Sequence, residues 1–164
     1  MIADEQARRI ALFFLFTLMD ERVALQAAHK TVAHLKAVAP PAQGAMGSHS
    51  ELGTARDVSA FLDDGALVGV LRKFYEQHRK LLPKHKPVTM PASAWQLPEK
   101  TDIASWMKFQ KGTADNEVVA VVLSKVLGFS DEAIAEGLNI SIGTTRYRVG
   151  KGIKHLGAII KAGA

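Results

Sequence analysis

Segment 130–156 most constrains the fold, because it carries the start and stop signals of two consecutive helices. Ser130 is a favourable N-cap residue, and the acidic residues after it suit the positive end of a helix dipole. Asn139 tolerates the left-handed backbone that a tight corner requires, and Ser141 can cap the helix that follows. The sequence therefore predicts two helices joined by a tight corner at residues 139–141.

The second of these helices combines a buried stripe with a basic face. Four residues at helical spacing should pack against the first helix and the valine-rich segment before it: Thr145, Val149, Gly152 and Leu156. The opposite face carries Thr144, Arg146, Tyr147, Gly150, Lys151 and Lys154. Residues 143–161 contain five Lys or Arg and no Asp or Glu, which favours contact with nucleic-acid phosphates. The alternative is a solvated face whose cations only complement the helix dipole.

Glycines in this region conflict with the helix prediction. Gly137 lies inside the first helix, and Gly150 and Gly152 lie inside the second. Each of the latter two costs a helix about 0.5–1 kcal/mol relative to alanine, in a protein stabilised by only about 5–15 kcal/mol. We therefore expect the second helix to end near Val149 or to become ordered only on binding.

The rest of the chain predicts an all-α fold. Apolar spacing predicts helices over residues 3–38, with a corner capped by Asp20, and over 54–82, with a break near 63–65. Another helix is predicted over 101–112, capped by Thr101 or Asp102. The segment "NEVVAVVLSKVLGF" has the valine content of a buried strand. Its acidic start and the glycine at its end favour a helix instead.

Two segments rich in turn-forming residues divide these helices. Residues 39–54 are rich in Pro, Gly and Ser and should form a loop. Residues 83–101 contain four prolines, which remove amide donors and disfavour helix, so we place a domain boundary there. The expected organisation is an N-terminal helical bundle at 1–82, a proline-rich linker at 83–101 and a C-terminal helix-turn-helix domain at 102–164.

Composition and motifs exclude several classes of function. The absence of cysteine excludes disulfides, zinc fingers and thiol catalysis, and it suits a reducing, cytoplasmic compartment. The six histidines form no i, i+4 pair, and no phosphate-loop or nucleophile-elbow motif occurs. We therefore expect no enzyme, no cofactor and no metal site. The run "IALFFLFTL" is shorter than the roughly 20 residues that span a bilayer and precedes no cleavage site, so we expect a buried core helix and no membrane partner.

The segment "LGFSDEAIAEGLNISIGTTRYRVGKGIKHL" resembles the C-terminal DNA-binding region of bacterial RNA polymerase sigma factors, particularly the small extracytoplasmic-function type. Matching positions occur in both predicted helices: Ser130, Glu132, Ile134, Ala135, Glu136, Leu138, Ile140, Gly143, Thr144, Arg148, Val149, Lys151 and Leu156. The resemblance covers residues 115–156 and implies a helix-turn-helix whose second helix enters the major groove of promoter DNA. It places Thr144, Arg146 and Tyr147 at base-reading positions. Arg148 and Lys151 would hold phosphates, and Lys154 lies on the same basic face.

The N-terminal helices resemble the other sigma-factor domain only weakly. Asp20 and Ala24 match its pattern. Other residues replace the acidic, glutamine and aromatic side chains that help this family dock on core RNA polymerase: Leu25, Gln26, His29 and Val32. The resemblance implies double-stranded promoter DNA as a partner, with core RNA polymerase or a regulatory protein as another. The alternative is a degenerate sigma-like protein–protein interaction module that does not initiate transcription.

A second family shares part of the C-terminal pattern. Response regulators with a C-terminal helix-turn-helix have a similar spacing of serine, isoleucine, alanine and leucine, and a terminal "K-x-L-G", here Lys154, Leu156 and Gly157. They usually carry lysine where Gly143 stands and histidine where Arg148 stands. These two residues favour the sigma-factor resemblance, and a response-regulator-type DNA-binding protein stays as the alternative.

Overall fold

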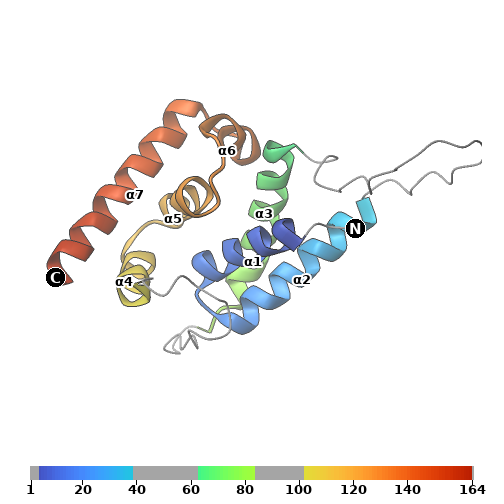
Figure 1. Cartoon of the computed structure of the whole chain (residues 1–164), viewed down its shortest axis with the longest axis horizontal. Helices are drawn as coiled ribbons and strands as arrows, with labels where there is room; N and C mark the ends of the chain where they lie inside the picture. The colour runs from blue at the N-terminus through green and yellow to red at the C-terminus, as the bar shows by residue number, and fades with distance from the viewer. Residues whose placement is uncertain (1–3, 39–62, 84–101, 164) are drawn as a thin grey trace, which may run out of the picture.

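The computed structural model describes residues 4–38, 63–83 and 102–163, and every regular element in these ranges is helical (Figure 1). The elements are α1 (Asp4–Leu18), α2 (Glu21–Val38), α3 (Asp64–His78), the 3-10 turn η2 (Arg79–Leu81), α4 (Ile103–Gly112), α5 (Asp115–Val121), the π turn η3 (Val122–Val126), α6 (Asp131–Leu138) and α7 (Ile142–Gly163). The all-α prediction is confirmed. The predicted loop at 39–54 and, apart from Pro83, the predicted linker at 83–101 lie outside the described residues.

α1 and α2 form a packed helix pair with a short corner, as the sequence predicts. Met19 adopts a left-handed conformation with φ 52°, and the Asp20 carboxylate accepts the amide of Val23 at 3.0 Å. Phe13 and Phe14 are fully buried, so the run "IALFFLFTL" belongs to the core. Among the described helices, none combines the length and apolarity needed to cross a membrane.

α3 crosses α6 at very short range, which joins the first three helices to the C-terminal helix pair (Figure 1). Asp63 caps α3 by accepting the amide of Ala66 at 2.7 Å. A Cβ atom built on Gly137 of α6 would lie 2.4 Å from Cβ of Val68 and 2.5 Å from the carbonyl oxygen of Gly65. No side chain fits in that space, so Gly137 is what allows the two backbones to approach.

α4 and α5 complete the core. Asp102, one of the two predicted caps, begins α4 by accepting the amide of Ser105 at 3.0 Å. Trp106 is buried and donates its indole N–H to the carbonyl of Phe16 in α1 at 2.9 Å. The valine-rich segment is helical up to Val126, as predicted, and the glycine near its end, Gly128, has φ +72°. One hydrophobic cluster therefore contains residues from both sides of the segment 84–101.

α7 is a continuous helix along the edge of the molecule, from α6 to α4 (Figure 1). The prediction that this helix ends near Val149 is therefore wrong. A Cβ atom on Gly152 would lie 2.5 Å from Cγ2 of Val121 and 3.4 Å from the carbonyl oxygen of Glu117. Gly152 thus lets α7 pack directly on α5, and this tertiary contact outweighs the weak helix propensity of glycine.

Candidate nucleic-acid interface

The corner between α6 and α7 is fixed by local hydrogen bonds. Ser130 caps α6, with its hydroxyl accepting the amide of Ala133 at 3.1 Å. Asn139 adopts the left-handed conformation, with φ 55° and ψ 50°. The hydroxyl of Ser141 then accepts the amide of Thr144 at 3.0 Å, which satisfies one of the free donors at the start of α7. All three of these predicted roles are confirmed, and together they set the direction in which α7 leaves the corner.

The predicted inner stripe of α7 is buried. Thr145 is fully buried, Val149 is 7% exposed, Gly152 is buried and Leu156 is half-buried. Thr145 stands where the sigma-factor pattern has an apolar residue. Its hydroxyl donates to the carbonyl of Ser141 at 3.2 Å, so the buried polar atom has a partner. This packing holds α7 with its opposite face toward solvent.

That outer face exposes four of the six predicted DNA-binding residues. The side chains of Arg146 and Lys151 are 66% and 55% exposed, Tyr147 is 65% exposed, and Lys154 is also exposed. Nε of Arg146 donates to Oδ2 of Asp131 in the first turn of α6 at 2.9 Å. This hydrogen bond and the charge of Asp131 raise the pKa of Arg146, so its guanidinium stays charged.

The other two, Thr144 and Arg148, are half-buried, and the exposed Lys151 is already paired with an acidic residue. Thr144 is half-buried, and its hydroxyl shares a hydrogen bond of 2.9 Å with Ser141. Nζ of Lys151 forms an ion pair of 2.7 Å with Glu117 of α5, which raises the pKa of Lys151. Nζ of Lys151 also lies 5.9 Å from the ring centroid of Tyr147, so Lys151 belongs to the same outer face.

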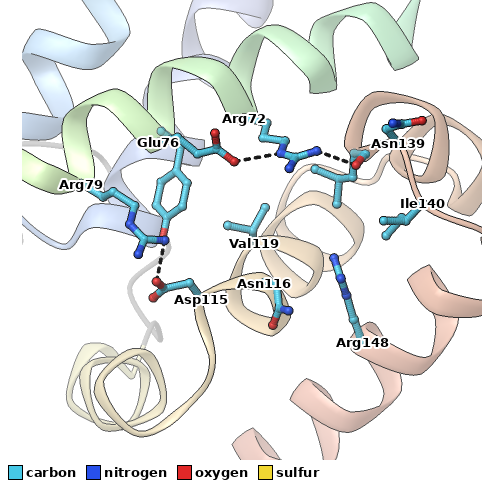
Figure 2. Close-up of a pocket in the computed structure, with 11 residues that line it drawn as sticks. Arg72, Glu76, Arg79, Asp115, Asn116, Val119, Asn139, Ile140 and Arg148 are labelled. Carbon is cyan, nitrogen blue, oxygen red and sulfur yellow. Dashed lines mark hydrogen bonds and ion pairs between the residues drawn. The ribbon is translucent and has the colours of Figure 1, made fainter.

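Arg148 is half-buried and points from α7 into a groove of about 370 Å³ between α3, α5 and the corner (Figure 2). Two ion pairs line this groove: Arg72 with Glu76 at 3.0 Å and Arg79 with Asp115 at 2.7 Å. Arg148 has no acidic partner among the residues that the structure describes. Its positive charge is therefore available to a ligand, but on a different side of α7 from Tyr147.

Sequence reasoning missed the partners of these cations. The sequence shows Asp131 only as an acidic residue in the first turn of α6, and Glu117 only as one in the first turn of α5. No sequence pattern marks Arg72, although its guanidinium donates to the carbonyl of Leu138 at 2.6 Å and so caps the end of α6. The pairs are 15, 34 and 66 residues apart, and no local pattern connects them.

Comparison with known proteins identifies the fold. No protein-family model and no curated protein matches the chain. A solved structure that it resembles is the sigma factor RpoE in complex with the anti-sigma factor NepR from Bartonella quintana, with a TM-score of 0.64 and 20% sequence identity. The alignment covers 93% of this chain and 89% of that one. The chain therefore has a sigma-factor-like fold.

Proposed function

We propose that this chain is a sigma-factor-like transcription regulator that binds double-stranded promoter DNA through α6 and α7, used as a helix-turn-helix. The observation that carries the proposal is the outer face of α7, where Arg146, Tyr147 and Lys154 are exposed on a helix fixed by the Asn139 corner. A major groove about 12 Å wide admits a helix presented in this way.

The fold likeness favours the sigma-like proposal over the response-regulator alternative. It extends over 93% of the chain and so includes the N-terminal helices. The response-regulator resemblance was based on the C-terminal motif alone. Because the fold likeness covers 93% of the chain, we assign roles to the residues of α7 by the sigma-factor pattern and not by the response-regulator pattern.

In this proposal the six residues divide into two roles. Arg146 reads a base edge, for which the preferred target of a guanidinium is the O6 and N7 pair of guanine. Tyr147 contacts a thymine methyl group or a phosphate, and Thr144 lies beside it at the start of the helix. Lys154, Arg148 and Lys151 hold phosphates, which sets affinity without reading sequence.

Selection of duplexes from a random library at about 50 mM salt tests the proposal, because electrostatic binding is strong at low salt. The wild type should enrich a preferred sequence, and its affinity should fall steadily as salt is raised. Arg146→Ala should relax the preference at one base pair. Lys151→Ala should weaken all duplexes alike and reduce the salt slope by about one. Failure of the wild type to bind any duplex would contradict the proposal.

A protein-binding role is the second candidate. The similar sigma factor was solved in complex with an anti-sigma factor, and this favours a regulatory protein as a partner of this chain as well. Core RNA polymerase is a further proposed partner, from the sequence resemblance alone. Co-purification of the full chain with core RNA polymerase tests directly whether the polymerase is bound. A reconstituted transcription assay separates the candidates, since accurate initiation would rule out an interaction module that has lost the initiating role.

A further inference from the structure

The ion pair between Arg146 and Asp131 uses only one edge of the guanidinium. Nε of Arg146 donates to Oδ2 of Asp131 at 2.9 Å. Among the described residues, no protein group accepts a hydrogen bond from Nη1 or Nη2 of Arg146. The guanidinium is thus held at the nitrogen nearest its stem, and its two terminal nitrogens are directed toward solvent.

Asp131 is itself firmly placed. It is the first residue of α6, directly after the capping residue Ser130, and its side chain is 31% exposed. The Cα atom of Asp131 is therefore fixed by α6, which is packed against both α3 and α7. The short Asp131 side chain reaches Arg146 from this fixed point, and while the hydrogen bond is formed it restricts the rotamers that Arg146 can adopt.

We propose that Asp131 is a positioning residue that makes Arg146 selective for guanine. This inference rests on the proposed DNA-binding function. With Nε occupied, Arg146 can approach DNA only with its two terminal nitrogens, whose spacing matches O6 and N7 of guanine. The carboxylate also weakens the attraction of Arg146 for phosphate, because it neutralises the guanidinium and repels a second anion. Asp131 therefore lowers affinity for DNA in general and raises the preference for one base.

The chain contains a matched control for this idea. Glu117 pairs with Lys151 at 2.7 Å and places a carboxylate beside a cation of the same helix. An ammonium is a point charge without the planar fork of arginine, so its partner cannot orient a two-pronged contact. Removing the charge of Glu117 should change affinity without changing base preference.

The experiment compares Asp131→Ala with Glu117→Gln on duplexes selected by the wild type. The base pair read by Arg146 is first located as the one at which Arg146→Ala relaxes preference. Affinity is then measured for the selected duplex and for duplexes with another base, or with 7-deazaguanine, at that position. Asp131→Ala removes the acceptor and should reduce the guanine preference by about tenfold and strengthen binding to unrelated duplexes. Glu117→Gln should strengthen binding to all duplexes and leave the preference unchanged.

Two further arms separate positioning from a loss of structure. In the Arg146→Ala background, Asp131→Ala should have no further effect on the preference. Asp131→Asn, whose amide oxygen can still accept from Nε of Arg146 but carries no charge, should keep most of the preference and strengthen binding to unrelated duplexes. An unchanged guanine preference in Asp131→Ala, or an equal fall in Asp131→Ala and Glu117→Gln, would overturn the inference while leaving the proposed function intact. If the wild type binds no duplex, the proposed function fails first and this inference fails with it.

Discussion

Replacing Gly137 by alanine should destabilise the protein, although alanine is the better helix former. The added Cβ would lie 2.4 Å from Cβ of Val68 and 2.5 Å from the carbonyl oxygen of Gly65. Neither atom can rotate away, so α3 and α6 must separate. Overpacking of this kind costs about 1–3 kcal/mol, and the upper end applies because main-chain atoms are involved. Subtracting about 1 kcal/mol for the helix propensity of alanine leaves a net loss of about 2 kcal/mol.

The assay is urea and thermal unfolding followed by circular dichroism, with Gly150→Ala as the control. A Cβ on Gly150 would meet nothing within 4 Å, so that variant should gain about 0.5–1 kcal/mol from helix propensity alone. For a chain of this size, the loss in Gly137→Ala corresponds to a fall in Tm of about 4–8 °C. A Gly137→Ala protein at least as stable as the wild type would refute the close crossing of α3 and α6.

Two other predictions follow from the same packing. Gly152→Ala should lose about 1 kcal/mol in urea unfolding, less than Gly137→Ala, because the clashing atom is a side-chain methyl of Val121 2.5 Å from the new Cβ; a stabilised variant would contradict the contact between α5 and α7. Burial, aided by the charge of Asp115, raises the pKa of Tyr75 from 10.0 to about 12. In a Tyr147→Phe background the tyrosinate absorbance should therefore rise near pH 12. Because this folded-state pKa is raised, stability should be lost as pH increases from about 10 to about 12, and a titration near 10 would show that Tyr75 is not buried.

The parts of the fold that sequence predicts are those fixed by neighbouring residues. Asp20, Ser130 and Asn139 act within three or four positions of themselves, by accepting a nearby amide or by adopting a left-handed conformation that their own chemistry permits. The helix start at Asp102 belongs to the same group. Such signals depend on the local chain alone, so one sequence was enough to find them.

The structural role of Gly137 and Gly152 cannot be predicted from their neighbours in sequence, because the residues that they contact are distant in the chain. Gly137 and Gly152 look like weak points when each helix is considered alone, and helix propensity counts them so. Their value comes from Val68 and Val121, which are distant in sequence and touch the space that a side chain would fill. A propensity describes an isolated helix, whereas a helix crossing depends on two. The ion-pair partners of Arg146 and Lys151 are also distant in sequence, so local patterns do not predict them either.

In the proposed DNA-binding role, the five cations of α7 differ in how much of their charge remains for a phosphate or a base. Arg146 keeps its two terminal nitrogens for DNA while its Nε stays with Asp131. The side chain of Glu117 is only 10% exposed, so its carboxylate depends on Lys151 as its ion-pair partner. An ammonium has three donors, and Lys151 can hold a phosphate while it keeps Glu117. Counting charges along the sequence therefore overstates the positive charge that α7 would offer to DNA in this role, since the carboxylate of Glu117 already balances the charge of Lys151.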